Sequence, residues 1–270
     1  MAAPGPRCSH PCGSPQAWVA HSLRAIEAAA NQSGLIRDRQ SRYRRYAKAC
    51  TDINCVFLSR GGRFMLSRML VSLGHTGWSA EIGVWGGEHS MSIMQKWPQG
   101  GQHFLVDPYR HYNTSCPTTP LNHYDASGRV RRKGRTSIMR LVGDKQCSVK
   151  QQRFDDVYTK TSKLVHRRFG ERAVFLRNMS VDGARQLPMS SLDFIYIDAR
   201  HDYAGVLEDM RAWWPKLCAG GIFAGHDYEG EVPGAVHEFV RTDLRSSSPL
   251  YVTADHPASW FILRMPQPCK

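Results

Sequence analysis

Short apolar runs alternate with longer segments of helical periodicity over most of the chain after residue 78. Seven of these runs have the length and composition typical of strands, namely Ser79–Val84, His103–Asp107, Ala173–Arg177, Leu192–Asp198, Gly221–Gly225, Tyr251–Thr253 and Trp260–Leu263. Ser90–Lys96 and Gly205–Lys216 space their apolar residues as a helix does. Because alternating strands and helices build parallel sheets, the pattern predicts an α/β protein with a doubly wound, mostly parallel seven-stranded sheet and helices on both faces.

The alternation breaks between the second and third predicted strands. Residues 110–170 contain Pro117, Pro120 and the basic run Arg129–Arg135, and they hold 14 Lys and Arg against four Asp and Glu. A long insertion inside a compact domain usually covers a functional site or is mobile. We therefore expect residues 110–170 to form a basic insertion that acts as a lid, with some helix near Phe154–Phe169.

The N-terminal 34 residues differ in composition from the rest of the chain. They are rich in Ala, Pro, Gly and Ser and contain one acidic residue, Glu27, which is typical of a disordered leader or a targeting segment. Within them, Ala17–Ala30 is a candidate helix. Residues 35–270 are expected to form one domain, because a chain of this length can still bury a single core. The expected compartment is the cytoplasm, or an organelle if residues 1–34 are a transit peptide.

Composition narrows the classes of protein. The net charge of +13 is concentrated in residues 1–50 and 110–170. It favours a solvated basic surface over a nucleic-acid surface, since no aromatic run of the RNA-binding type accompanies it. No uncharged apolar run approaches the ~20 residues of a membrane span. The eight Cys residues are scattered in a chain long enough to fold without disulfides, so reduced thiols are expected.

The strongest motif is the run AEIGVWGGEHS at Ala80–Ser90, in which a predicted strand ends in glycines and leads into a helix. Glycines let the backbone turn tightly and let a ligand approach main-chain N–H groups. The next strand ends in Asp107, 20 residues after Gly87, where a carboxylate can accept the hydroxyls of a ribose. The spacing suits a nucleoside cofactor, although the G-x-x-G-G order differs from the dinucleotide fingerprint. Glu81, within the strand, suits a ligand that carries an ammonium group.

Four motifs in order carry a resemblance to a known family. EIGVWGGEHS, HFLVDPYRHY, SLDFIYIDARHDYAGVLEDMRAWWPKL and CAGGIFAGHDY together resemble the class I S-adenosylmethionine-dependent methyltransferases, on their small-molecule branch. The resemblance extends from Ser79 to Leu263 apart from residues 110–170. It implies a Rossmann-like sheet, S-adenosylmethionine as cofactor, and methyl transfer to a small-molecule acceptor.

The resemblance also implies a role for each matched residue around the cofactor. Glu81, Gly83 and Gly87 would shape the pocket for the methionine part, and Asp107 would hold the ribose. Ser180, which follows the third strand, would flank the adenine.

The acceptor chemistry would come from the ends of the fourth and fifth strands. Asp198 would face either the methionyl ammonium or a metal. His201 and His226 are the candidate bases, because transfer to a hydroxyl requires removal of a proton and a neutral imidazole accepts one near pH 7. The alternative for each histidine is a hydrogen bond that only stabilises a turn.

A divalent metal is a further candidate cofactor. IDARHDY and GGIFAGHDY resemble the segments that hold a divalent ion in catechol-type and caffeoyl-CoA-type O-methyltransferases, and Asp198 and Asp227 fall at two ligand positions. Their oxygen ligands would suit Mg²⁺. Tyr228 stands where those families have Asn, so one ligand is missing. Substitution by His226 would favour a softer transition ion.

Alternatives remain at this point. An NAD(P)-dependent oxidoreductase would use the same glycine turn and Asp107, and a basic RNA-binding protein or RNA methyltransferase could be built on the same core. We expect O-methylation of a small acceptor. The basic residues 110–170 favour an anionic acceptor, and nucleic acid is the less favoured partner. No membrane association is expected, and a homodimer is compatible with the sequence.

Overall fold

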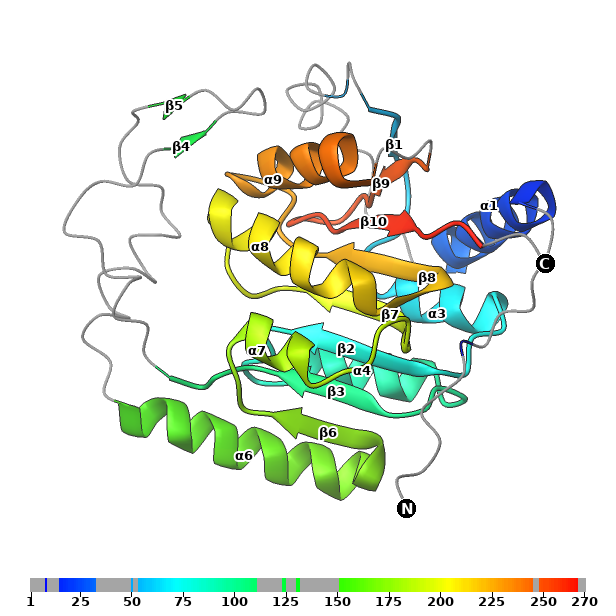
Figure 1. Cartoon of the computed structure of the whole chain (residues 1–270). Coiled ribbons are helices and arrows are strands. Elements are labelled where there is room, and N and C mark those ends of the chain that lie inside the picture. Colours follow the sequence, from blue (N-terminus) through cyan, green and yellow to red (C-terminus); the bar gives the residue numbers. More distant parts are fainter. Residues whose placement is uncertain are drawn as a thin grey trace.

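The structure is a computed structural model that describes Cys8, residues 15–32, Cys50, residues 53–110, 123–124, 130–131, 151–244 and 248–266. Its main feature is an eight-stranded sheet with the order β1-β9-β10-β8-β7-β2-β3-β6 (Figure 1). The strands are β1 (Cys55–Phe57), β2 (Trp78–Ile82), β3 (His103–Val106), β6 (Ala173–Leu176), β7 (Leu192–Ile197), β8 (Leu217–Gly225), β9 (Leu250–Val252) and β10 (Trp260–Leu263). Two short strands, β4 (His123–Tyr124) and β5 (Val130–Arg131), pair separately.

The sheet is doubly wound, as the sequence predicts. From β2 the chain builds outward through β3 and β6, and then returns to β7 on the other side of β2 and builds outward through β8. All pairs are parallel except those of β10 with β8 and β9. The order therefore reverses between β2 and β7, which is where open α/β sheets bind their ligands. The sequence predicts seven strands, and the eighth is β1, which pairs with β9.

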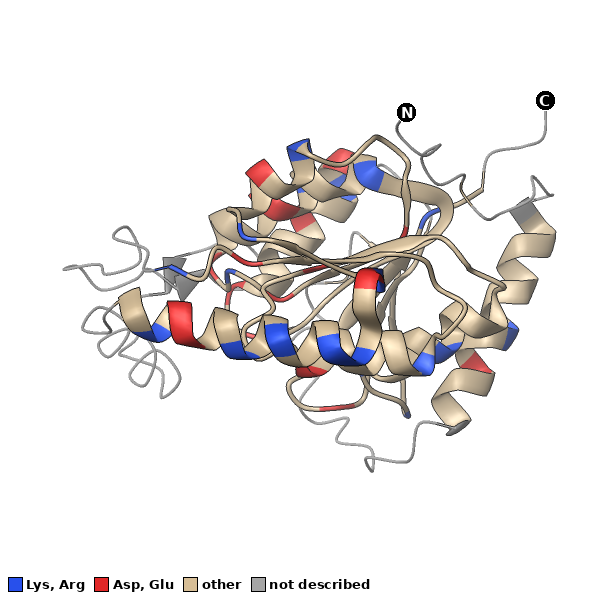
Figure 2. Cartoon of the chain, turned by 90° about the horizontal axis from the view of Figure 1, so that it is seen from below, with Lys and Arg blue, Asp and Glu red and all other residues tan. Residues whose placement is uncertain are grey.

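Helices cover both faces of the sheet (Figures 1 and 2). One face carries α7 (Ser180–Arg185), α8 (Tyr203–Trp213) and α9 (Val232–Glu238), and the other carries α1 (Pro15–Gln32), α3 (Met65–Ser72), α4 (Glu88–Lys96) and α6 (Gln151–Phe169). Short 3-10 turns lie at Gly170–Arg172 and Trp214–Lys216, and a π-helical turn lies at Phe239–Leu244.

Strand β7 shows why its sequence is mostly apolar; its one charged residue, Asp193, is buried and accepts a hydrogen bond from Gly77 N at 2.8 Å. All six of its residues are buried. Ile195 and Ile197 pack in the cluster that holds α8 and α9, while Phe194 and Tyr196 pack with α1, α3 and α4 on the opposite face. A central parallel strand covered on both faces has no solvent side, so its residues do not alternate between apolar and polar.

Within the N-terminal segment, the predicted helix at Ala17–Ala30 is confirmed. Residues 15–32, which lie within the predicted segment 1–34, form helix α1, and Ala25, Ile26 and Ala29 of α1 are buried against α3. The small alanine side chains, which made the composition look like that of a leader, allow close packing between the two helices. No helix among the described residues is both long and apolar enough to cross a membrane.

Helix α6 lies inside the predicted insertion at residues 110–170 and contributes to the core. Phe154 and Val165 are buried in a cluster with residues of α4 and β3. Its Lys and Arg side chains, among them Arg153, Lys160 and Lys163, are exposed on the outer side of the helix (Figure 2). Residues 111–122, 125–129 and 132–150 lie outside the described residues, so the basic lid stays a prediction.

Two disulfides correct the expectation of reduced thiols. Cys8 is bonded to Cys218 of β8, and Cys50 is bonded to Cys55 of β1, with Cα–Cα distances of 5.6 and 5.8 Å. The first pair is separated by 210 residues, so the spacing of cysteines along the chain gives no sign of it. The other four cysteines lie outside the described residues.

Candidate active site

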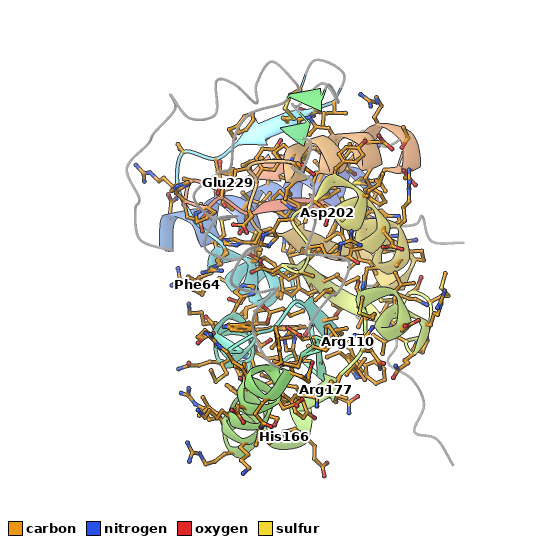
Figure 3. All side chains as sticks on the ribbon, turned by 90° about the vertical axis from the view of Figure 1, so that its left-hand side faces the viewer. Phe64, Arg110, His166, Arg177, Asp202 and Glu229 are labelled. Carbon is orange, nitrogen blue, oxygen red and sulfur yellow. A yellow bond between two sulfur atoms is a disulfide. The ribbon has the colours of Figure 1, made fainter. Side chains whose placement is uncertain are left out.

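The ends of four parallel strands bring the predicted residues to one edge of the sheet. Backbone hydrogen bonds continue the ladder past the strands: Gly83 N donates to Val106 O (2.9 Å), Asp198 N to Ile82 O (2.7 Å) and His226 N to Ile197 O (3.0 Å). Figure 3 looks onto this edge, where Arg110, Asp202 and Glu229 mark the loops that follow β3, β7 and β8. The structure thus places the glycine turn, Asp107, Asp198 and His226 side by side.

The turn after β2 requires its glycines. Gly83 has a φ of +87°, and a Cβ there would lie 2.1 Å from the carbonyl oxygen of Asp198. Gly87 begins α4 with a φ of +75°, and a Cβ there would lie 2.9 Å from a methyl carbon of Thr161. Between them Trp85 also has a positive φ, of 47°, and is exposed. Backbone strain of this kind persists where the surrounding structure enforces it, often at functional sites.

Asp107 ties the end of β3 to the glycine turn. Its Oδ2 accepts hydrogen bonds from the backbone N–H groups of Val84 and Trp85 (3.0 Å each), and its Oδ1 accepts one from Tyr109 N (2.8 Å). A carboxylate offers about four acceptor positions, so one remains for a ribose hydroxyl. Asp107 is half-buried, which leaves that position open to a ligand. The residue therefore fits the predicted ribose contact while it also holds the turn.

Glu81 lies beneath the turn and within the protein. Its carboxylate is in hydrogen-bond contact with His89 Nδ1 (3.1 Å) and with Ser90 Oγ. His103 bridges Ser90 and Ser79 through its two ring nitrogens, at 3.0 and 2.8 Å. Burial, with the charges of His89 and Arg172, lowers the pKa of His103 to about 3, so this imidazole is neutral. The Glu81 carboxylate therefore contacts residues at the start of α4 and does not point directly into the predicted methionine pocket.

Ser180 is likewise turned toward the interior. It begins α7, and its Oγ accepts a hydrogen bond from Trp213 Nε1 at 3.0 Å. This contact joins α7 to α8. The backbone of the loop from Asn178 to Ser180 remains at the edge of the sheet, while the Ser180 side chain has a packing partner.

Two carboxylates and two imidazoles meet at the ends of β7 and β8. His201 Nε2 lies 3.2 Å from Asp227 Oδ2 and 3.7 Å from Asp198 Oδ1. His226 Nδ1 lies 3.2 Å from Asp227 Oδ1 and 3.6 Å from Asp198 Oδ1. Asp227 has a positive φ of 48°, so it is a further strained position at this edge. These four residues are the candidate catalytic cluster.

Mutual charge controls the protonation of this cluster. Burial alone would raise the pKa of the Asp198 carboxyl, but hydrogen bonds from His201 and His226 and their positive charge hold that pKa well below its usual range. Burial alone would lower the pKa of each imidazole, but Asp198 and Asp227 raise the pKa of His201 and of His226 above the ordinary 6.5. The cluster therefore favours an ionised Asp198 carboxylate facing protonated imidazoles.

We expect both histidines to titrate above pH 6.5 in chelator-treated protein, as measured by NMR of their C2 protons. In Asp198→Asn both midpoints should fall, because a neutral amide no longer favours the imidazolium form. The other histidines of the chain serve as internal references. Midpoints that do not change in Asp198→Asn would contradict this electrostatic coupling.

The same atoms can hold a divalent ion. One ligand atom each from Asp198, His201 and Asp227 lie within 4.8 Å of one another. Two carboxylates and an imidazole suit Mg²⁺ less than they suit a transition ion, because nitrogen is a softer donor. Tyr228, at the position of the missing ligand, is buried, and its hydroxyl contacts His237 Nε2 at 2.5 Å. The structure thus adds His201 to the predicted pair Asp198 and Asp227.

Arg63 is a site residue that sequence reasoning missed. Its Nη1 lies 4.0 Å from Asp198 Oδ2. It comes from the segment before α3, which precedes the glycine motif and shows only a helical pattern, so nothing in its sequence context points to the site. A small hollow also opens beside the cluster, and its apolar lining consists of Ile197, Val206, Val232 and Trp260.

Comparisons with known proteins show the family of this chain. The model of the methyltransferase domain family matches residues 80–228. No curated protein matches the chain. Among solved structures, the O-methyltransferase NovP is 16% identical and has a TM-score of 0.51, with 75% of this chain and 77% of that chain covered.

Two further solved structures are similar at lower scores. An O-methyltransferase from Bacillus cereus in complex with SAH is 12% identical, with a TM-score of 0.47 and coverage of 92% and 89%. An rRNA methylase from Streptococcus thermophilus is 11% identical, with a TM-score of 0.44 and coverage of 71% and 87%. Since the family model spans more than half of the chain, the chain belongs to the methyltransferase domain family and is an S-adenosylmethionine-dependent methyltransferase.

Proposed function

We propose that this enzyme methylates a hydroxyl oxygen of a small-molecule acceptor, with a histidine of the catalytic cluster as the base. The observation that supports the proposal is the position of His201 and His226 against two carboxylates, at the same sheet edge as Asp107. In methyl transfer the acceptor oxygen attacks the sulfonium methyl carbon, the bond from that carbon to sulfur breaks, and the hydroxyl proton must leave.

His201 is the better placed of the two bases. Its side chain is 51% exposed, whereas that of His226 is 11% exposed. An entering hydroxyl can therefore reach His201 directly. Because the pKa of His201 is raised above 6.5 by Asp198 and Asp227, His201 acts as a base only at a pH high enough to remove its proton, and the rate should rise with pH. Asp227 then stabilises the imidazolium that forms, as the carboxylate of a catalytic triad does. His226 is the more buried of the two histidines, and it fixes the orientation of Asp198 and Asp227.

A divalent ion belongs to the same proposal. Asp198, His201 and Asp227 would hold it, and when bound it would lower the pKa of the acceptor hydroxyl. His201 would then be a ligand, and the remaining imidazole, His226, would take the proton. An anionic group on the acceptor and a homodimeric assembly stay predictions from the sequence.

The test is transfer of a labelled methyl group from S-adenosylmethionine. We expect labelled methyl ethers from a panel of monohydroxy phenols, catechols and carboxylated phenols, and no label in ribosomal RNA. His201→Gln should reduce the rate by about 10²–10⁴-fold, the range of a general base, while His166→Gln, on the exposed side of α6, should leave it unchanged. The panel is run with added Mg²⁺ and with chelator. Label in RNA and in none of the hydroxyl compounds would overturn the proposal.

A further inference from the structure

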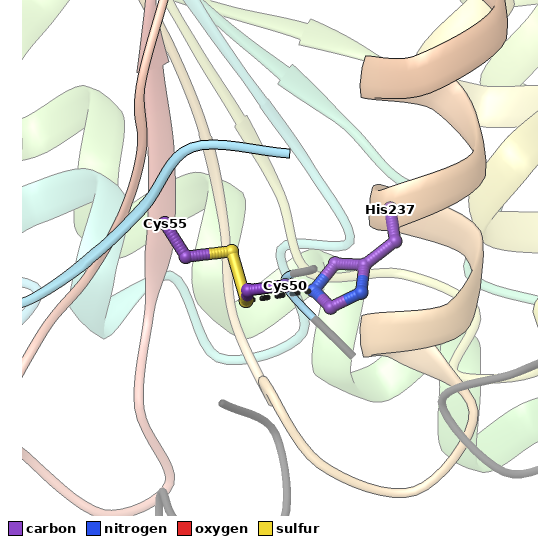
Figure 4. A group of neighbouring side chains, drawn as sticks. All are labelled: Cys50, Cys55 and His237. Atoms are coloured by element: carbon purple, nitrogen blue, oxygen red, sulfur yellow. Dashed lines mark hydrogen bonds between the residues drawn. A yellow bond between two sulfur atoms is a disulfide. The ribbon is translucent and has the colours of Figure 1, made fainter. Parts of the chain in front are cut away.

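A second group of metal-binding side chains lies outside the catalytic cluster. Cys50, Cys55 of β1 and His237 of α9 place two sulfurs and one ring nitrogen within 4.8 Å of one another (Figure 4). Methyl transfer uses none of these atoms. Cys55 lies on the edge strand β1, Cys50 lies shortly before it in the sequence, and His237 lies on a helix on one face of the sheet.

The chemistry of these ligands differs from that of the catalytic cluster. Thiolate sulfur and imidazole nitrogen are the ligands that structural zinc sites use, and cysteines there are typically separated by two to four residues. Cys50 and Cys55 have four residues between them. Carboxylate oxygens, which dominate at Asp198 and Asp227, are absent from this group. The group therefore suits a soft ion such as Zn²⁺.

The distances are close to those of a tetrahedral zinc site. With Zn–S at ~2.3 Å and Zn–N at ~2.0 Å, a sulfur and a nitrogen ligand stand about 3.5 Å apart. Cys50 Sγ and His237 Nε2 are 3.9 Å apart. The two sulfurs are bonded to each other in the structure, and as separate ligands they would stand about 3.8 Å apart. The Cα atoms of the two cysteines are 5.8 Å apart, and reduction frees both side chains to rotate about their Cα–Cβ bonds.

We propose that Cys50, Cys55 and His237 form a zinc site that is available only when the Cys50–Cys55 disulfide is reduced. A dithiol reductant supplies two electrons and two protons, the S–S bond breaks, and the reductant leaves as its own disulfide. Binding of Zn²⁺ then displaces the two thiol protons, and the ion is held by two thiolates and an imidazole. A water molecule completes the four ligands. The oxidised form has no thiolate in this group and cannot bind the ion there.

Zinc binding must also change the contact between α9 and the loop after β8. His237 Nε2 is the atom that faces Cys50, and it is also the atom in contact with the Tyr228 hydroxyl, at 2.5 Å. The lone pair of a ring nitrogen can bind a metal or accept a hydrogen bond from the Tyr228 hydroxyl, but it cannot do both at once. Metal binding therefore releases Tyr228 from His237, next to Asp227 of the catalytic cluster.

The experiment uses the full chain and Cd²⁺ as a probe for Zn²⁺. Cadmium bound to thiolate gives a ligand-to-metal absorption band that carboxylate sites do not give, so the catalytic cluster does not interfere. The protein is dialysed against chelator and titrated before and after reduction by a phosphine, which supplies no competing thiol. We expect the band at one equivalent in the reduced form only, and competition by Zn²⁺ should remove it.

Matched variants identify the ligands. The band should disappear in Cys50→Ser. It should persist in Cys8→Ser/Cys218→Ser, which lacks the second disulfide found among the described residues. His237→Gln, which keeps both thiols, should weaken binding by more than about tenfold, since even partners beyond the ligands contribute 10–100-fold. Its interpretation therefore does not depend on how the cysteine variants fold. A band that survives in Cys50→Ser, an unchanged affinity in His237→Gln, or no band in the reduced protein would overturn the proposal.

Discussion

Gly83→Ala is expected to lower the melting temperature by about 6–12 °C and to abolish binding of S-adenosylhomocysteine. The left-handed backbone conformation costs a Cβ-bearing residue about 1 kcal/mol, and the overlap with the carbonyl oxygen of Asp198 adds about 2 kcal/mol. About 3 kcal/mol corresponds to that change in melting temperature for a domain of this size. Since relief of the overlap moves the glycine turn away from Asp198, the cofactor pocket deforms as well.

Gly74→Ala is the matched control. Gly74 has a φ of +75°, close to that of Gly83, but a Cβ there meets nothing within 4 Å. This variant should show only the backbone cost of about 1 kcal/mol and should bind S-adenosylhomocysteine normally. If the two variants lose the same stability and the same affinity for S-adenosylhomocysteine, then the close approach to Asp198 is not the reason for glycine at position 83. Differential scanning calorimetry and isothermal titration calorimetry measure both quantities.

Asp198→Asn is expected to reduce kcat by about 10²–10⁴-fold, the range attributed to acid–base groups. The amide keeps the size of the side chain and removes the charge that faces His201 and His226. The imidazolium that forms as the proton leaves the acceptor then loses one of its two carboxylate partners. If an ion is bound, the same substitution removes one of its ligands.

The dissociation constant of S-adenosylhomocysteine separates the two roles predicted for Asp198. We expect it to stay unchanged in Asp198→Asn, because the Asp198 carboxylate is already in contact with the two histidines. A large increase with unchanged kcat would instead assign Asp198 to the methionyl ammonium. Asp182→Asn, on the exposed side of α7 where Asp182 pairs with Arg185, is the control for loss of a carboxylate, and it should leave both quantities unchanged.

The sequence predicts seven of the eight strands of the main sheet. Strands such as β7 are mostly apolar because both faces are covered, and their ends are marked by Gly or Asp. Strand β1 escaped prediction because it has only three residues, all of them partly exposed, and it is stabilised by its pairing with β9. Such a strand depends on a partner distant in the sequence, which periodicity does not report.

The site is predictable where it depends on strand ends. Asp107, Asp198 and His226 each follow a parallel strand, and parallel strands end at the same edge, so their proximity follows from topology. The partners of buried side chains do not follow from it. Glu81 lies against His89 and Ser90, and these contacts depend on how α4 packs beneath the turn.

Helix α1 makes the N-terminal region a structural part of the enzyme. Ala25, Ile26 and Ala29 cover Met65 and Met69 of α3, which have no solvent exposure. Proteolytic trimming after residue 32 would uncover this apolar surface, and the truncated enzyme would tend to aggregate. Removal of the first 32 residues is therefore expected to lower the stability of the enzyme, because the α3 side chains that α1 covers would meet solvent.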